Sequence, residues 1–300
     1  MMKPFFENKI DQKSTGKNTA SLIKSQKIRS DFIARYGYIP DSILKHDKKD
    51  TSKIAQSLGR RYEDTAKAKK IFRVSGQGSR SGALSTFPQK IGHLIVNFYC
   101  PKDGIVYDPF AGHNSRMELT FKADRHYTGV DLSKIFMKSN RQIKDKLIEQ
   151  QGYFKSNKKI KLIEGSSDKV DLPDNYGDFT ITSPPYWDIE YYGDEPEQLG
   201  KNKTYQEFLD AISKNIKENF RILKPGAFCA WFMNDFVKNK IFYPYHSDLI
   251  PIFINAGFEI YQIYIIDLGV PIGIAFIQDI INHKRFPKRH EYCLLFKKPK

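Results

Sequence analysis

The feature that most constrains the fold of this 300-residue chain is an alternation of short β-rich runs with longer amphipathic segments after residue 85. The runs are rich in Val, Ile, Phe and Tyr, whereas the segments between them place apolar residues at helical spacing. Strands that alternate with helices form a mostly parallel sheet with helices on both faces, so we expect an α/β, Rossmann-like fold with seven strands. The expected strands are Ile105–Tyr107, Tyr127–Val130, Lys161–Glu164, Asp178–Thr182, Ala227–Phe232, Glu259–Asp267 and Tyr292–Phe296, and the expected helices include Lys134–Gln151, Tyr205–Leu223 and His246–Ala256.

The chain divides near residue 83 into a basic N-terminal region, 1–83, and the α/β domain, 84–300. The N-terminal region carries only short amphipathic stretches, at Ser21–Tyr36 and Thr51–Ile71. The segment Ser75–Gly82 is rich in Gly and Ser but lacks the Gly-Lys-Ser/Thr ending of a phosphate-binding loop. We therefore expect a flexible linker or a mobile flap there.

The net charge of +15 is unevenly distributed, since residues 1–85 hold 19 Lys and Arg against 8 Asp and Glu, a net +11. A second basic cluster contains Lys284, Arg285, Lys288 and Arg289. Both clusters indicate a polyanionic partner, and the N-terminal region is expected to be a DNA-contacting arm or a solvated extension. A lysine-biased genome gives similar composition, so charge alone does not demonstrate nucleic-acid binding.

Other features of the composition argue against secretion, membrane insertion and metal binding. No apolar run approaches the roughly 20 residues needed to cross a bilayer. The first 17 residues lack the apolar stretch of a secretory signal. The three cysteines, Cys100, Cys229 and Cys293, have no C-x-x-C spacing, so we expect buried free thiols, no metal site and a cytoplasmic location.

Polar residues follow the first three expected strands, at the edge where α/β sheets bind ligands. Asp108-Pro-Phe-Ala-Gly112 offers a carboxylate and small residues that let the backbone approach a ligand. Asp131 ends the second strand, where an acid binds ribose hydroxyls. Asp168 closes a polar turn after the third strand. Because the chain contains no G-x-G-x-x-G motif, these residues predict a nucleoside pocket rather than a dinucleotide pocket.

The fourth expected strand ends in the most specific motif, Thr182-Ser-Pro-Pro-Tyr-Trp187. Two consecutive prolines fix the backbone into a rigid loop. The hydroxyl of Ser183 and the loop carbonyls can accept hydrogen bonds from a planar amine, whose lone pair then becomes available for attack. Tyr186 offers a face on which a base can stack. The alternative of a proline-rich structural turn fits poorly directly after a buried apolar strand.

With these motifs, the chain resembles the DNA amino-methyltransferases, which modify N4 of cytosine or N6 of adenine, and among them the phage-type modification methylases. Asp108–Gly112 resembles their cofactor motif, Ser183–Tyr186 their catalytic motif, and Thr86-Phe-Pro-Gln-Lys90 their methionine-end motif. The resemblance covers residues 84–300 and implies a class I methyltransferase fold with S-adenosylmethionine as the cofactor. It implies catalytic roles for Ser183, Pro184, Pro185 and Tyr186, and cofactor contacts from Phe87, Gln89, Asp108, Phe110, Gly112, Asp131, Asp168 and Ser183.

The resemblance further implies that DNA is bound with its target base flipped out or single-stranded. We expect Trp187, Lys284, Arg285, Lys288 and Arg289 to contact the nucleic acid, with a core tryptophan as the alternative for Trp187. Little sequence follows the last expected strand, so target reading is expected from the N-terminal region, the loops 187–203 and 269–290, or a partner. A cognate restriction nuclease or a separate recognition protein is a partner that the sequence leaves open.

One segment departs from the family pattern. The family continues the glycine turn with Ser or Gly and Thr, whereas this chain has His113-Asn-Ser-Arg116. The turn is therefore bulkier, which affects the expected cofactor affinity.

The first residue of the catalytic motif predicts which base is methylated. Within the family, Ser before Pro-Pro-Tyr favours N4 of cytosine, whereas Asp or Asn favours N6 of adenine, so we expect a site-specific N4-cytosine methyltransferase and keep N6-adenine as the alternative. Methylation of RNA or of a protein amide is a second alternative. A catalytically degenerate DNA-binding protein is a third.

Overall fold

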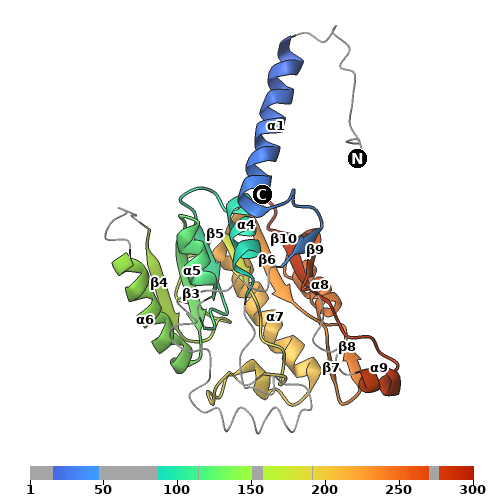
Figure 1. Ribbon diagram of the computed structural model, residues 1–300. Coiled ribbons are helices and arrows are strands. Elements are labelled where there is room, and N and C mark those ends of the chain that lie inside the picture. Colours follow the sequence, from blue (N-terminus) through green and yellow to red (C-terminus); the bar gives the residue numbers. More distant parts are fainter. Residues whose placement is uncertain (1–15, 47–86, 114, 151–157, 191, 270–276) are drawn as a thin grey trace. The chain divides into compact units, whose positions relative to one another are not determined.

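The computed structural model describes residues 16–46, 87–113, 115–150, 158–190, 192–269 and 277–300 (Figure 1). The chain separates into two units, residues 1–41 and residues 42–300. In the first unit, the helix α1 spans Gly16–Tyr36 and contains the predicted stretch Ser21–Tyr36. The predicted stretch Thr51–Ile71, the Gly/Ser-rich segment and the expected boundary at residue 83 lie outside the described residues.

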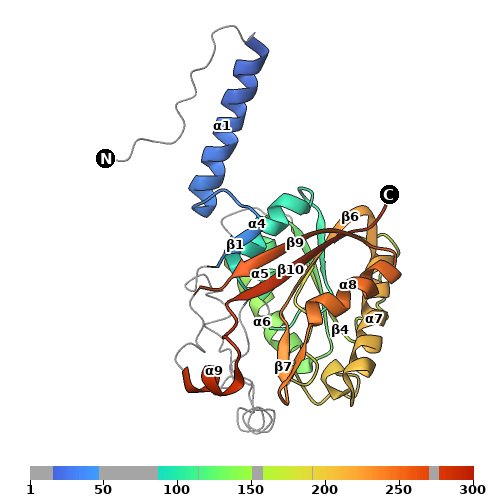
Figure 2. The ribbon, with the colours of Figure 1, turned by 90° about the vertical axis from the view of Figure 1, so that its right-hand side faces the viewer.

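The second unit is built on an eight-stranded sheet with the order β1-β9-β10-β6-β5-β2-β3-β4. The five strands from β6 to β4 run parallel, and β10 is antiparallel to both of its neighbours. This order confirms the Rossmann-like α/β class (Figure 2). The strands are β1 (Ile43–Lys45), β2 (Ile105–Asp108), β3 (His126–Asp131), β4 (Ile160–Glu164), β5 (Gly177–Thr182), β6 (Leu223–Met233), β9 (Glu259–Asp267) and β10 (His290–Lys297).

All seven predicted strands are present, and the predicted number of strands is too low by one. The additional strand, β1, pairs in parallel with β9 at the edge of the sheet and buries Leu44. Three residues are too few to produce a two-residue periodicity, so no sequence pattern marks this strand. A separate antiparallel hairpin, β7 (Phe236–Lys238) with β8 (Ile241–Tyr243), follows β6 directly and was not predicted.

Helices cover both faces of the sheet (Figure 2). On one face α4 packs against α5, and α6 contacts β3 and β4; on the other face α7 packs against α8 and on β6. The helices are α4 (Gln89–Tyr99), α5 (Ser115–Lys122), α6 (Lys134–Gln150), α7 (Tyr205–Ile222), α8 (Tyr245–Asn255) and α9 (Ile277–His283).

The helix α7 shows how the sequence determines these elements. Thr204 and Glu207 form a reciprocal capping box that satisfies backbone donors at the helix start. Phe208, Ile212 and Ile216 recur every four residues and are fully buried against Trp231 and its neighbours on β6. The helix ends one residue before the predicted end, just ahead of Lys224-Pro-Gly226.

The three cysteines are buried and free, as predicted. Across the residues that the structure describes, no helix combines the length and the apolar character needed to span a membrane.

Candidate functional site

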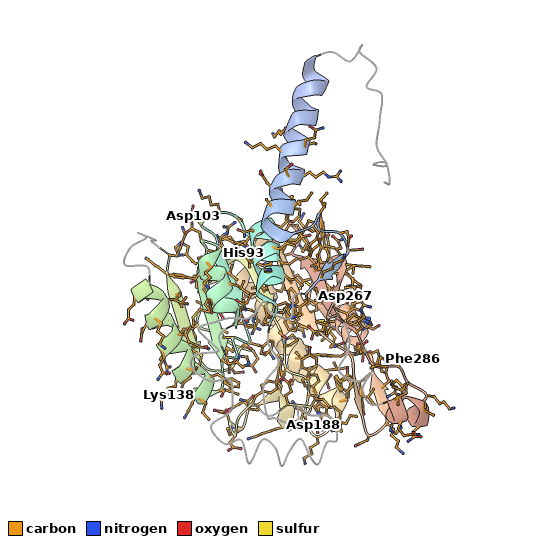
Figure 3. All side chains as sticks on the ribbon, in the orientation of Figure 1. His93, Asp103, Lys138, Asp188, Asp267 and Phe286 are labelled. Carbon is orange, nitrogen blue, oxygen red and sulfur yellow. The ribbon has the colours of Figure 1, made fainter. Side chains whose placement is uncertain are left out.

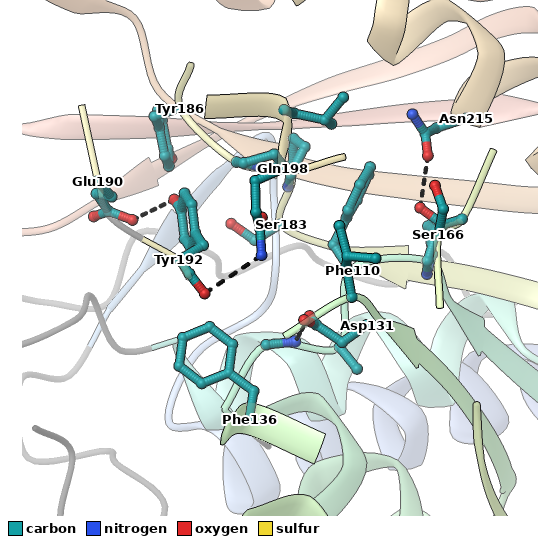
Figure 4. Close-up of a pocket in the computed structure, with 18 of the residues that line it drawn as sticks. Phe110, Asp131, Phe136, Ser166, Ser183, Tyr186, Glu190, Tyr192, Gln198 and Asn215 are labelled. Carbon is teal, nitrogen blue, oxygen red and sulfur yellow. Dashed lines mark hydrogen bonds between the residues drawn. The ribbon is translucent and has the colours of Figure 1, made fainter. Parts of the chain in front are cut away.

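A cavity of about 330 Å³ opens at the carboxyl ends of β2, β3, β4 and β5 (Figure 4). The turns after these strands bring together residues from the four motifs that the sequence analysis singled out. Of the predicted site residues, those that line the cavity are Phe87, Phe110, Gly112, Asp131, Asp168, Ser183, Pro184, Pro185 and Tyr186. These predicted residues therefore lie together around one cavity, whereas Gln89, Asp108 and Trp187 do not line it.

Asp131 and Gly112 join the first two turns. The backbone N–H of Gly112 donates to Oδ2 of Asp131 at 2.7 Å, and the N–H of Ser133 donates to Oδ1 at 2.8 Å. Gly112 has a φ of +54°, a left-handed conformation that favours glycine. Burial raises the pKa of the Asp131 carboxyl to about 6, against the opposing effect of the two N–H donors. Each oxygen keeps a lone pair for a further donor, which suits ribose hydroxyls.

Asp108 occupies a different place from the one predicted, because it is fully buried beneath the cavity and does not line it. Its Oδ1 accepts from the hydroxyl of Thr182 at 2.7 Å, and its Oδ2 accepts from the hydroxyl of Tyr127 at 2.8 Å. Nε of Arg116 donates to the same Oδ2 at 2.7 Å. These bonds saturate the carboxylate and tie the end of β2 to the end of β5.

Arg116 explains how the chain accommodates its bulky turn. Its guanidinium lies over the ring of Phe87 at 5.2 Å, donates to the carbonyl of Phe110 as well as to Asp108, and lines the cavity. The arginine thus folds back onto the turn. Pairing with Asp108 compensates its charge. Arg116 was noted in the sequence because it departs from the family pattern, but the sequence did not indicate where its side chain would lie.

Apolar rings and a polar turn complete this part of the cavity. Phe110 and Phe136 line it, and His113 meets the ring of Phe136 edge-on, with 6.0 Å between centroids. After β4, Asp168 is exposed at the cavity wall, and the Ser167 hydroxyl donates to Asn215 on α7 at 2.6 Å. Flat apolar surfaces beside hydrogen-bonding groups suit a nucleoside.

Gln89, a predicted cofactor contact, begins α4 next to Phe87. Its side-chain amide donates to the carbonyl of Phe87 at 3.2 Å, and the residue does not line the cavity. The neighbouring Thr86 lies outside the described residues.

The catalytic motif lines the cavity directly beside the nucleoside-binding turns. Figure 4 shows Ser183 between Tyr192 and Phe110. The carbonyl of Pro185 accepts from the hydroxyl of Tyr245 at 3.2 Å, and the carbonyl of Tyr186 accepts from the N–H of Ile189 at 2.9 Å. The loop is therefore fixed from both sides.

Trp187 lies in the core and not at the cavity wall. Its side chain is 5% exposed, and its indole N–H donates to the carbonyl of Asn202 at 2.8 Å. Nζ of Lys238 lies 3.7 Å from the ring centroid. The residue has a φ of +44°, a strained conformation that its packing maintains. This placement corresponds to the core alternative and leaves no surface for stacking on nucleic acid.

Sequence reasoning missed two acids at the far end of the cavity, Glu190 and Glu291. The hydroxyl of Tyr192 donates to Oε2 of Glu190 at 2.5 Å, and the amide of Gln198 donates to the carbonyl of Tyr192 at 3.5 Å (Figure 4). Burial is the largest cause of the raised pKa of both carboxyls, and the neighbouring Glu190 helps to raise that of Glu291 to about 7. The acidic, aromatic stretch Asp188-Ile-Glu-Tyr-Tyr-Gly193 directly after the catalytic motif is the sequence signal that could have indicated Glu190.

The predicted nucleic-acid residues fall into two groups. Lys284 and Arg285 are exposed just after α9. Lys288 is half-buried and donates to the backbone carbonyl of Asp235, and burial lowers its pKa to about 8. Arg289 forms an ion pair with Asp267 at 2.8 Å. Among the described residues, Lys284 and Arg285 are therefore the two of these four that are exposed and not engaged in such contacts.

Parts of the chain are similar to known proteins. The sheet order itself confirms the predicted Rossmann-like fold. Residues 178–300 match the N6/N4 DNA methylase family. The Type II beta methyltransferase M.BslI of Bacillus sp. (strain NEB-606) is 30% identical over an alignment of 165 residues. The alignment covers 50% of this chain and 17% of that protein's length. These matches confirm the resemblance to the DNA amino-methyltransferases.

Two solved structures are similar to parts of the chain at lower identity. A methyltransferase from Methanosarcina mazei is 15% identical, covering 72% of this chain and 99% of that chain, with a TM-score of 0.47. A DNA modification methylase from Thermus thermophilus, crystallised with S-adenosyl-L-methionine, is 23% identical, covering 45% of this chain and 52% of that chain, with a TM-score of 0.34.

The cofactor site makes a prediction about pH. We expect the Kd of the wild-type protein for S-adenosylmethionine to be about tenfold higher at pH 5 than at pH 7.5, because a carboxyl with a pKa near 6 is about nine-tenths protonated at pH 5. Protonation removes acceptors that ribose hydroxyls need. Calorimetric titration measures the effect, and Asp131→Asn is the control, whose weaker affinity should not change over this range. A wild-type Kd that does not change with pH would exclude Asp131 from cofactor binding.

Proposed function

We propose that this protein transfers a methyl group from S-adenosylmethionine to an exocyclic amine of a DNA base, with N4 of cytosine favoured over N6 of adenine. One observation carries the proposal. The rigid Ser183–Tyr186 loop lines the same cavity as Asp131 and Gly112, so an amine acceptor site and a nucleoside site are contiguous. The match of residues 178–300 to DNA methylases supports DNA as the substrate.

The chain's own residues bind and orient the reactants. S-adenosylmethionine, when bound, supplies an electrophilic methyl group. Asp131 would accept from the ribose hydroxyls of the cofactor, and Phe110 and Phe136 would flank the adenine ring of the cofactor. Asp168 and the neighbouring serines would supply polar contacts to it. Ser183 and the carbonyl of Pro184 accept the amine hydrogens of the target base, and Tyr186 stacks on its ring. Alignment of the amine with the methyl group accounts for most of the acceleration.

The identity of the base rests on Ser183. A hydroxyl is a weaker acceptor than the carboxylate or amide with which the resemblance associates N6 of adenine. Cytosine is also the smaller base, and the side chains of Glu190 and Tyr192 occupy part of the cavity wall. Both features favour N4 of cytosine, with N6 of adenine as the second candidate.

The target base must leave the helix stack to reach the loop. The cavity holds about 330 Å³ between turns of the sheet edge, a space that suits single bases and nucleosides and not a base pair within a duplex. We therefore propose that the base is flipped out of duplex DNA or is presented single-stranded.

The segment after α9, which leads into β10, is the candidate DNA surface. Lys284 and Arg285 are exposed there, next to Phe286, whose side chain is 88% exposed and projects from the molecule (Figure 3). Basic and apolar side chains together are typical of proteins that grip and wedge into DNA.

We expect the double variant Lys284→Ala, Arg285→Ala to weaken DNA binding and to reduce the slope of log K against log salt by about 2, about 1 for each phosphate contact. Fluorescence anisotropy with duplex DNA at several salt concentrations measures this slope. Lys102→Ala is the matched control and should leave the slope unchanged. Lys102 is exposed and lies just ahead of β2, at the amino end of that strand. An equal slope in the double variant and in wild type would remove this surface from the proposal.

Partners and location follow from the function. A cognate restriction nuclease or a recognition protein is the proposed partner that supplies sequence specificity, and the proposed location is the cytoplasm. RNA and protein amides remain the alternative acceptors. A degenerate DNA-binding protein has little support, because the catalytic loop is intact and faces the cavity.

Incubation with labelled S-adenosylmethionine and separate DNA, RNA and protein acceptors tests the proposal. We expect label on DNA only, and its loss in Ser183→Ala. Label on RNA or protein would redirect the substrate, whereas no label together with no cofactor binding would support the degenerate alternative.

A further inference from the structure

Two acids, Glu190 and Glu291, line the same cavity as the catalytic loop, and the mechanism above does not use them. Glu190 comes from the loop after β5, and Glu291 is the second residue of β10. On β10, His290 and Tyr292 point to the opposite face, where Tyr292 stacks on His246 with 3.8 Å between centroids. The alternation of the strand thus directs Glu291 into the cavity.

The two acids differ in their partners. Glu190 accepts the hydroxyl of Tyr192 at 2.5 Å, which stabilises its ionised form. Glu291 has no hydrogen-bond partner among the described residues. Two neighbouring carboxyls in a site shielded from water do not both ionise readily, so the one without a donor holds the proton.

The charged and titratable groups around Glu291 are few. Glu190 and the hydroxyl of Tyr186 lie near it in the loop after β5, where the hydroxyl of Tyr192 donates to Glu190, and Lys288 lies near it in the segment before β10. Burial and Glu190 raise the pKa of Glu291 to about 7, and Lys288 opposes this only in part. Burial also raises the pKa of both tyrosines, so they stay neutral through the neutral range.

Both candidate bases present the same pair of groups at the reacting edge. In cytosine and in adenine, the exocyclic amine lies beside a ring nitrogen that accepts hydrogen bonds. Ser183 and Pro184 supply acceptors for the amine, but the ring nitrogen needs a donor, and an acceptor left unpaired in a closed site is costly. In guanine and thymine, that ring position carries a hydrogen and lies beside a carbonyl.

We propose that Glu291, in its protonated form, donates a hydrogen bond to the ring nitrogen next to the target amine and so selects cytosine and adenine over guanine and thymine, while Glu190 keeps Glu291 protonated. The proposal rests on the proposed function and names the residue that reads the edge of the base. It makes Glu291 a specificity-determining residue that contacts substrate.

The test is the rate constant of a single turnover, with cofactor and duplex DNA both saturating, between pH 6 and pH 9. In wild type we expect the rate constant to fall about tenfold for each pH unit well above 7, as Glu291 loses its proton. Glu291→Gln carries a permanent donor and should stay within a few-fold of wild type at pH 6.5, with a flat profile above. Glu190→Gln removes the charge that raises the pKa of Glu291, so its rate constant should begin to fall at a lower pH.

Glu259→Gln changes an exposed acid at the start of β9, paired with Lys297 at the far end of β10 from Glu291, and this matched control should follow wild type. The inference is overturned if Glu291→Gln falls with pH as wild type does. It is also overturned if Glu291→Gln is inactive at pH 6.5 although it binds cofactor and unfolds at the wild-type temperature. A wild-type protein that transfers no methyl group to DNA at any pH contradicts the proposed function itself, and this inference with it.

Discussion

Replacing Asp108 with alanine is expected to lower the free energy of unfolding by about 3–5 kcal/mol, the cost of removing one partner of a buried ion pair. The carboxylate is completely buried, and its loss leaves Arg116 with an uncompensated charge. It also leaves the hydroxyls of Tyr127 and Thr182 without their acceptor. Urea denaturation followed by circular dichroism measures the change.

Arg289→Ala is the control for this prediction, because its ion pair with Asp267 is exposed and should contribute only about 0–1 kcal/mol. Asp108→Asn keeps part of the hydrogen bonding and should fall between the two. A loss below about 1 kcal/mol in Asp108→Ala would contradict the buried network. Such a small loss would favour the first prediction from the sequence, in which Asp108 contacts the cofactor.

Replacing Tyr186 with alanine is expected to lower the rate of methyl transfer to DNA about ten- to a hundredfold, the range that corresponds to the loss of one stacked base contact. The tyrosine lines the cavity beside Ser183 and meets the ring of Tyr245 edge-on at 6.1 Å, so the change also opens space in the wall. A steady-state methylation assay with labelled cofactor measures the effect.

Tyr186→Phe retains the ring and should keep most of the activity, since stacking and not the hydroxyl is the proposed contribution. The affinity for S-adenosylmethionine should change little in either variant. Equal activity of Tyr186→Ala and wild type would show that the target base does not stack on this residue. A large loss in Tyr186→Phe would assign the role to the hydroxyl.

The sequence alone predicted the α/β class and all seven of its expected strands, and nine of the residues it singled out line the cavity. Alternating runs from Ile105 to Phe296 carry their own periodicity, and the ends of parallel strands meet at one edge, so motifs far apart in the chain could be placed together. The rigid dipeptide Pro184-Pro185 is a local signal that needs no knowledge of its neighbours.

The remaining features depend on tertiary contacts that no local pattern encodes. Asp108 and Asp131 both follow a strand, yet only the structure shows that Arg116, Tyr127 and Thr182 occupy the first while the second remains open to the cavity. Trp187 lies next to the catalytic loop in sequence but turns into the core. Glu291 lies more than 100 residues from Ser183 and reaches the same cavity only because β10 inserts beside β6.

The central claim concerns the atom that receives the methyl group. Mixed-sequence duplex DNA is incubated with the protein and labelled S-adenosylmethionine and then digested to nucleosides, which are separated by chromatography. We predict that the label elutes as N4-methylcytosine and is lost in Ser183→Ala; label as N6-methyladenine would keep the reaction and change the base. Label on a ring carbon, or none on DNA from a protein that binds the cofactor, would contradict the assignment of this cavity to amine methylation of DNA.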